Sequence, residues 1–139
     1  MKLPIYQVDA FTDKLFGGNP AAVMPLEGWL ADDILQTIAA ENNLAETAYF
    51  IKTELGYHLR WFTPTTEVEL CGHATLATAF VLFNDLGFEG SVIQFETLSG
   101  ILTVTKNGDW LNLNFPIDQF QIAVPPPAHT SMLLPRNVM

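Results

Sequence analysis

The stretch HATLATAFVLFNDL, residues 73–86, decides the fold. Its apolar side chains would surround a helix on all sides instead of forming one stripe; they are Ala74, Leu76, Ala77, Ala79, Phe80, Val81, Leu82 and Phe83. A helix that is apolar all round has to be enclosed by other elements. Gly87 follows directly and is placed to cap it. We therefore predict a central helix wrapped by the rest of the chain.

Short β-rich runs lie on both sides of this helix in the sequence. They are residues 5–11, 21–25, 46–52, 57–63, 91–96, 101–106 and 109–116. Asn107-Gly108 joins the last two runs and is among the strongest short hairpin signals. About seven strands and one enclosed helix indicate an α+β fold with a curved, mainly antiparallel sheet around the helix.

A second helix is predicted over residues 31–43, ADDILQTIAAENN. Helical spacing places Ile34, Ile38 and Ala39 on one face, with acidic residues in the first turn where the helix dipole favours them. We expect this face to pack on the core and the helix to end near Asn43.

Composition excludes several function classes. The net charge of −9, from 15 acidic against 6 basic residues, disfavours nucleic acid as a partner. No apolar run reaches the ~18 residues of a membrane span, and the N-terminus lacks a signal-peptide core, so no membrane partner and a cytoplasmic location are expected. The single cysteine forms no internal disulfide, and without paired cysteines or closely spaced histidines no metal site is expected.

Three motifs occur in one order along the chain: VDAFTDKLFGGNPAAV (8–23), IAAENNLAETAYF (38–50) and RWFTPTTEVELCGHATLATAF (60–80). In order and spacing they resemble the N-terminal half of the PhzF-like isomerase and epimerase family, named for an enzyme of phenazine biosynthesis and related to diaminopimelate epimerase. Three ordered motifs are far more specific than any one short pattern. The resemblance implies two similar domains, each a sheet curled round a central helix, with the active site in the cleft between them.

The resemblance also defines the expected domain boundaries. Residues 1–116 correspond to the family's N-terminal domain, and its second domain has no counterpart in this chain. The segment 117–139 contains VPPPAHTSMLLPRNVM, whose three consecutive prolines disfavour helix and central strand, so it is predicted to be a Pro-rich linker or tail.

The family's general acid/base glutamate falls at Glu46, and its active-site histidine at His73. A carboxylate in an apolar cleft suits the transfer of a proton between carbon positions. A neutral imidazole at a helix N-terminus can donate a hydrogen bond to an oxygen that gains charge. The alternatives are a solvated carboxylate at a strand start for Glu46 and a simple helix cap for His73.

Further residues are candidates for substrate binding. Gly72 and Ala74, which flank His73, would let the helix N-terminus approach a substrate carboxylate closely. Asn19, in the Gly-Gly-Asn-Pro loop, is either a polar contact to the substrate or a turn-forming residue. Cys71 has two competing interpretations: a thiolate base such as diaminopimelate epimerase uses, activated by the helix N-terminus, or a small buried apolar residue.

We therefore expect a cofactor-independent isomerase or epimerase acting on a small carboxylate-bearing metabolite, with its catalytic status open because half the site is missing. The alternatives are a noncatalytic truncated or assembly module, and a thiol-dependent amino-acid racemase or epimerase that uses Cys71. The missing half would come from a homodimer or from a separate second-half chain. An apolar patch near Pro64 to His73 would seek that partner.

Overall fold

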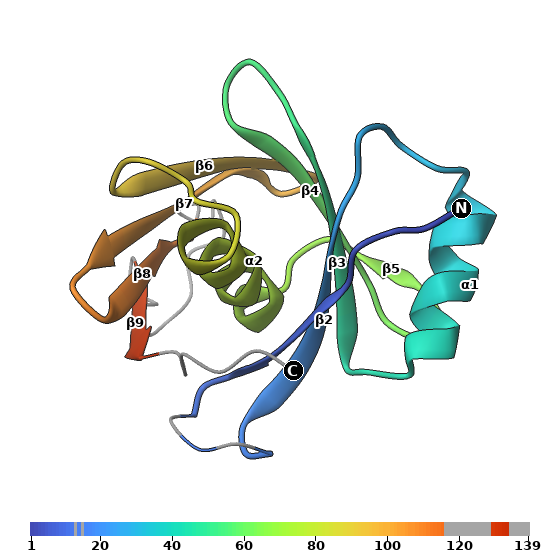
Figure 1. Cartoon of the computed structure of the whole chain (residues 1–139), viewed down its shortest axis with the longest axis horizontal. Coiled ribbons are helices and arrows are strands. Elements are labelled where there is room, and N and C mark those ends of the chain that lie inside the picture. Colours follow the sequence, from blue (N-terminus) through green and yellow to red (C-terminus); the bar gives the residue numbers. More distant parts are fainter. Residues whose placement is uncertain (13, 15, 116–128, 134–139) are drawn as a thin grey trace, which may run out of the picture.

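The computed structural model describes residues 1–12, 14, 16–115 and 129–133. In this part of the chain a nine-stranded sheet curves around helix α2 (Gly72–Asn84), while helix α1 (Asp32–Asn42) lies on the outer side of the sheet (Figure 1). The predicted α+β architecture, with a curved sheet wrapped around a central apolar helix, is confirmed.

The strands follow the order β1-β2-β3-β4-β6-β7-β8-β9 across the sheet, and β5 pairs with β4 outside this path. Their bounds are β1 Tyr6–Ala10, β2 Asn19–Pro25, β3 Glu46–Lys52, β4 Tyr57–Phe62, β5 Glu67–Val68, β6 Val92–Thr97, β7 Gly100–Asn107, β8 Trp110–Asn114 and β9 His129–Leu133. The β2–β3 and β4–β6 pairs are parallel, and the remaining pairs are antiparallel. Each parallel pair is connected through a helix, as such crossovers require.

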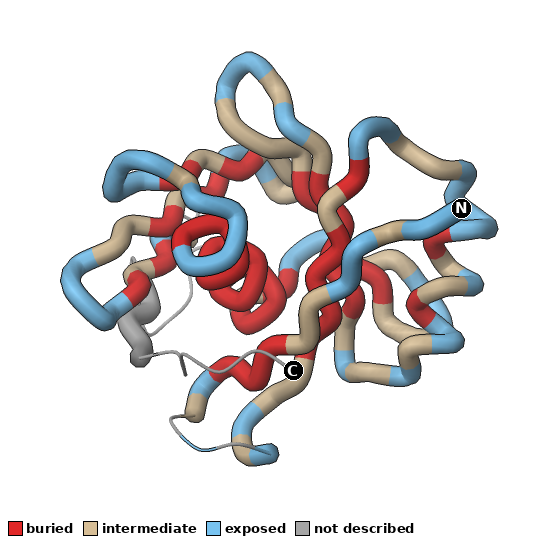
Figure 2. Tube along the Cα trace, viewed as in Figure 1, coloured by how far each residue is buried: buried red, intermediate tan, exposed pale blue. Residues whose placement is uncertain are grey.

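Helix α2 is buried from His73 to Phe83 without interruption. Figure 2 shows it as a continuously buried coil inside the sheet. Strands from before and after it in the sequence supply the enclosing side chains, which confirms the interpretation of residues 73–86. The helix ends at Asn84, slightly earlier than predicted, and Gly87 adopts the left-handed φ of 69° while the Phe88 N–H donates to the Leu82 carbonyl at 2.8 Å.

Helix α1 covers a smaller core on the outer face of the sheet. It ends as predicted, with Asn43 in the left-handed conformation at φ 51°. The predicted apolar face is confirmed at Ala39, which is buried, and at Ile38, which packs against this core, but not at Ile34, which is 42% exposed while Leu35 is fully buried. Leu35 shares the face of Ile38 and Ala39 at spacings of three and four residues, and the Tyr49 hydroxyl donates to the Leu35 carbonyl at 2.6 Å.

Strand β9 lies inside the segment 117–139, which the sequence analysis assigns to a linker or tail. It pairs antiparallel with β8 along its whole length. This part of the segment is therefore sheet; residues 117–128 and 134–139 lie outside the described residues. Among the residues that are described, no helix is long and apolar enough to cross a membrane.

Candidate active site

Two elements bring the predicted catalytic residues together. Glu46 is the first residue of β3, and its backbone pairs with Ala21 of β2. His73 lies in the first turn of α2, two residues after the N-cap residue Cys71. Because β3 begins beside the N-terminal end of the helix, side chains separated by 27 positions in the sequence converge.

The side chains of Glu46, Cys71 and His73 form one compact cluster. Their ligand-type atoms all lie within 4.8 Å of one another. His73 Nε2 is 2.8 Å from Glu46 Oε2, and His73 Nδ1 is 3.3 Å from Cys71 Sγ. The imidazole therefore stands between a carboxylate and a thiol.

The imidazole of His73 and the carboxylate of Glu46 lie close together but are not oriented to form a hydrogen bond. Within the described residues, neither His73 Nε2 nor Glu46 Oε2 has a hydrogen-bond partner, although both atoms are shielded from solvent. The buried indole nitrogen of Trp61, which also packs in the core around α2, has no partner either. Buried polar atoms are nearly always paired in folded proteins, and exceptions often mark functional positions.

Burial lowers the pKa of His73 below its ordinary value, and this effect outweighs the neighbouring Glu46 carboxylate and the Pro20 carbonyl, which act in the opposite direction. The imidazole is therefore neutral at neutral pH. A protonated Cys71 thiol can donate to Nδ1, which leaves the ring proton on Nε2, the nitrogen nearer the Glu46 carboxylate but not aligned with it for a hydrogen bond.

Cys71 is only 8% exposed. Burial raises its pKa to about 12, and the Glu46 carboxylate adds to the rise, while the backbone N–H groups of Ala74 and His73 counteract only part of it. Desolvation thus outweighs the activating effect of the helix N-terminus on this thiol and favours the buried apolar interpretation of Cys71, whose role stays a prediction.

The three residues expected to bind substrate occupy different settings. Gly72 packs against Phe115, since a Cβ at this position would lie 3.0 Å from the Phe115 ring. Ala74 is fully buried, and its N–H faces the Cys71 thiol. Asn19 is half-buried at the start of β2, next to Pro20, and its side chain makes no hydrogen bond to any described residue. Substrate binding by these three residues stays a prediction.

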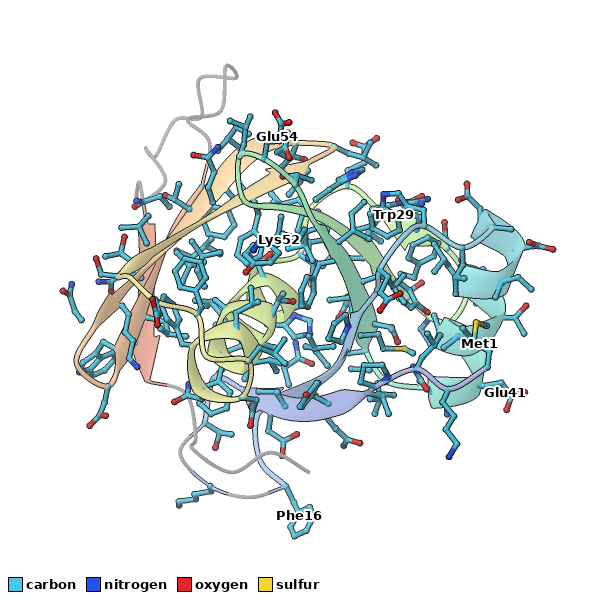
Figure 3. All side chains as sticks on the ribbon, turned by 45° about the horizontal axis from the view of Figure 1, so that its top comes forward. Met1, Phe16, Trp29, Glu41, Lys52 and Glu54 are labelled. Carbon is cyan, nitrogen blue, oxygen red and sulfur yellow. The ribbon has the colours of Figure 1, made fainter. Side chains whose placement is uncertain are left out.

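The sequence analysis did not single out Phe11, which borders the cluster. Its ring centroid lies 6.2 Å from that of His73, it is 50% exposed, and its φ of 63° is uncommon for a bulky residue. Asp9 supports the same loop by accepting the Phe16 N–H at 3.2 Å, and Phe16 projects from the loop tip (Figure 3). The VDAF motif contained both Asp9 and Phe11, but nothing in it indicated the left-handed backbone.

A shallow depression elsewhere carries no comparable chemistry. It is lined by Thr53, Glu54, Leu55, His58, Glu96 and Thr97. Glu54 lies at the opposite end of the molecule from Phe16 in Figure 3. Within the depression, the Thr53 hydroxyl donates to the Glu96 carboxylate at 2.6 Å. These two polar groups therefore already satisfy each other.

Comparison with known proteins places this chain in a family. The model of the family described as phenazine biosynthesis-like protein matches residues 8–131. An isomerase of uncharacterized function from Pseudomonas aeruginosa is 57% identical over 116 residues, which cover 84% of this chain and 45% of the relative. The human phenazine biosynthesis-like domain-containing protein is 48% identical over 125 residues, covering 84% of this chain and 43% of that protein.

Solved structures agree. A phenazine biosynthesis protein of the PhzF family from Enterococcus faecalis superimposes with a TM-score of 0.81 at 52% identity, over 85% of this chain and 45% of the other. A hydroxyproline epimerase from Agrobacterium vitis matches with a TM-score of 0.62 at 10% identity, which shows a shared fold alone. The chain spans about half the length of the curated relatives that it matches, at 45% of the Pseudomonas protein. It belongs to the phenazine biosynthesis-like, or PhzF-like, protein family.

Proposed function

We propose that this chain supplies the N-terminal half of an active site that isomerises or epimerises a small carboxylate-bearing metabolite without a cofactor. The observation that carries the proposal is the pair of partly buried Glu46 and buried His73, whose facing atoms Oε2 and Nε2 lie 2.8 Å apart, shielded from solvent and without a hydrogen-bond partner among the described residues. A carboxylate and a neutral imidazole kept from water are suited to moving a proton.

In this mechanism Glu46 removes a proton from a carbon atom of the substrate. The C–H bond breaks, its electron pair stays on the substrate and spreads toward an adjacent unsaturated group, and the proton moves to the carboxylate. Glu46 then returns the proton to another position or to the other face of the carbon. Neutral His73 donates to the oxygen that gains charge, and the N-terminus of α2 attracts the substrate carboxylate.

This chain covers 45% of the length of its Pseudomonas relative, so the other wall of the site would lie in a region of the family that the chain does not span. Candidate sources of that wall are a homodimer and a separate second-half chain. A noncatalytic assembly module is the rival function. The racemase alternative, in which Cys71 acts as a thiolate base, is disfavoured because burial raises the pKa of this thiol to about 12.

The test is solvent-deuterium incorporation. The chain is incubated in D2O with a panel of small amino, hydroxy and cyclic carboxylic acids, alone and after mixing with the C-terminal half of the Pseudomonas relative, and carbon-bound deuterium is measured by mass spectrometry. We expect Glu46→Gln to lower incorporation by roughly 10²- to 10⁴-fold, the usual contribution of a general acid/base.

Glu41→Gln is the matched control, since Glu41 is an exposed carboxylate on α1 (Figure 3) and should leave the rate unchanged. Equal rates for Glu46→Gln and the unaltered chain would remove Glu46 from the mechanism. Absence of deuterium exchange with every acid of the panel, both for the chain alone and for the chain mixed with the C-terminal half, would favour the noncatalytic alternative.

A further inference from the structure

We propose that Phe11 is a specificity-determining residue of the candidate site: its ring contacts the substrate beside His73 and favours substrates with an uncharged, apolar group next to the carboxylate. The ring centroids of Phe11 and His73 lie 6.2 Å apart, with 43° between the ring planes. His73 is buried, whereas Phe11 is 50% exposed. A molecule that reaches the imidazole from solvent can therefore contact the Phe11 ring as well. The inference rests on the proposed function, since it concerns the same site.

The backbone of Phe11 is held in a conformation that a bulky residue rarely adopts. Its φ is 63°. Such conformations persist only where the surrounding structure imposes them, and they occur often at functional sites. Phe16 has the same φ of 63° but is 82% exposed and projects from the loop tip (Figure 3). The contact with His73, and not the backbone alone, therefore distinguishes Phe11.

Neighbouring residues constrain the loop on both sides of Phe11. The carboxylate of Asp9, which is buried, accepts the Phe16 N–H at 3.2 Å. Gly18 has a left-handed φ of 71°, and a Cβ at this position would overlap the carbonyl oxygen of Ala10. Only glycine fits so close to the residue that precedes Phe11. These contacts keep the Phe11 ring beside His73.

The chemistry around Phe11 indicates which ligands the site accepts. The ring offers apolar surface with no hydrogen-bond donor or acceptor, so a charged group placed against it would lose hydration without compensation. The Glu46 carboxylate, 2.8 Å from His73, repels a second negative charge. The N-terminus of α2 attracts one carboxylate. We therefore expect the site to prefer monocarboxylates with an apolar flank over dicarboxylates.

The binding test compares isovalerate with succinate, two small acids that differ in the group remote from the first carboxylate. Binding is followed by the NMR signals of the His73 ring, assigned by their absence from His73→Gln, in the chain alone and mixed with the C-terminal half of the Pseudomonas relative. The chain should bind isovalerate at least about tenfold more tightly than succinate. Phe11→Gly should remove most of this preference, and Phe11→Leu, which keeps an apolar side chain, should retain part of it.

A second measurement needs no ligand. Burial lowers the pKa of His73. Phe11→Gly would admit water to the imidazole and should raise this pKa toward its ordinary value, because the charged form would be better solvated. Glu46 and Cys71, which face the imidazole, are unchanged in this variant. An NMR pH titration of the His73 signals measures the shift.

Phe16→Gly is the matched control, because it makes the same substitution at the same φ in the same loop, but at the exposed loop tip. It should leave the preference and the His73 pKa unchanged, and circular dichroism confirms that each variant is folded. The proposal is overturned if neither acid binds, if isovalerate is not preferred, if Phe11→Gly keeps the preference or the pKa, or if Phe16→Gly loses as much. Binding is measured without turnover, so a lack of deuterium exchange would defeat the proposed reaction and leave this result intact.

Discussion

At the scale of single residues, Cys71 shows how burial overrides a local electrostatic effect. The thiol sits at the N-terminus of α2 and faces two backbone N–H groups, a setting that ordinarily favours a thiolate. Desolvation and the Glu46 carboxylate both oppose the negative charge and outweigh these groups. The thiol therefore stays protonated and serves as a neutral neighbour to His73.

This balance predicts low thiol reactivity. With a pKa of about 12, alkylation of native Cys71 by iodoacetamide should be slow at pH 8 and should accelerate as the pH rises toward 12, because the thiolate is the reacting species. The urea-unfolded chain, whose thiol has an ordinary pKa, should react at least about a hundredfold faster at pH 8. Mass spectrometry measures both rates; comparable rates in the two states would show that Cys71 is an accessible thiolate and would revive the racemase alternative.

At the scale of elements, the two helices differ in how the sheet holds them. Strand side chains alternate between its faces, so Ala48 and Phe50 of β3 join the core around α2, whereas Tyr49 joins the core under α1. Helix α2 is covered on all sides, and α1 is covered on one side only. Neighbouring residues on α1 should therefore contribute very differently to stability.

Two adjacent substitutions test this arrangement. Leu35 is fully buried, so Leu35→Ala should lower the free energy of unfolding by about 2 to 5 kcal/mol through lost contacts and a cavity. Ile34 is 42% exposed, and Ile34→Ala should cost less than about 1 kcal/mol. Urea unfolding followed by circular dichroism compares the two; an equal or larger loss for Ile34→Ala would contradict the observed orientation of α1.

Much of this element pattern could be predicted from the sequence, and some of it could not. The all-round apolar stretch 73–86 and the Asn107-Gly108 hairpin are local signals, and the structure confirms both. The buried face of α1 contains Leu35, Ile38 and Ala39, which share one side of a helix at i, i+3 and i+4. The apolar pattern also admits Ile34, four positions before Ile38, and only the packing of α1 on the sheet decides that Leu35 is the buried one.

The candidate site was predictable only in part for the same reason. Glu46 and His73 were named from the family motifs, not from local spacing, and their approach depends on the position of β3 beside α2. The contribution of Phe11 depends on a left-handed backbone conformation in a loop, for which a bulky residue gives no signal. The motifs thus indicate which residues matter, but not how the fold arranges them.

At the scale of the whole molecule, the surface beside the cluster is less apolar than predicted. Between Pro64 and His73, Leu70 is the large apolar side chain that is clearly exposed, at 44%, while the other exposed residues of this stretch are polar. Phe11, 50% exposed beside His73, adds a second apolar contact. Both residues adjoin members of the cluster, since Leu70 precedes Cys71 in the sequence and the Phe11 ring lies beside His73.

Homodimerisation through this surface is testable with a matched pair. If two copies associate there, Leu70→Asp should shift the chain from dimer to monomer in sedimentation velocity at micromolar concentration, because a charge would be buried in the contact. Leu55→Asp, at a residue 64% exposed in the β3–β4 turn, should leave the dimer intact. A monomer before any substitution, or equal behaviour of the two variants, would exclude homodimerisation through this contact.

The enclosure of α2 also has a consequence for how the chain acquires its structure during synthesis. Strands β1 to β4 leave the ribosome before the helix, and β6 to β8 leave after it. Strand β6 pairs with β4, and β6 to β8 contribute side chains to the core around α2. Until these later strands have paired, one side of the apolar helix α2 stays exposed to solvent. Folding of the nascent chain therefore has to wait for contacts distant in sequence, which slows it and exposes a surface prone to aggregation. Chaperones that shield apolar segments would act during this interval.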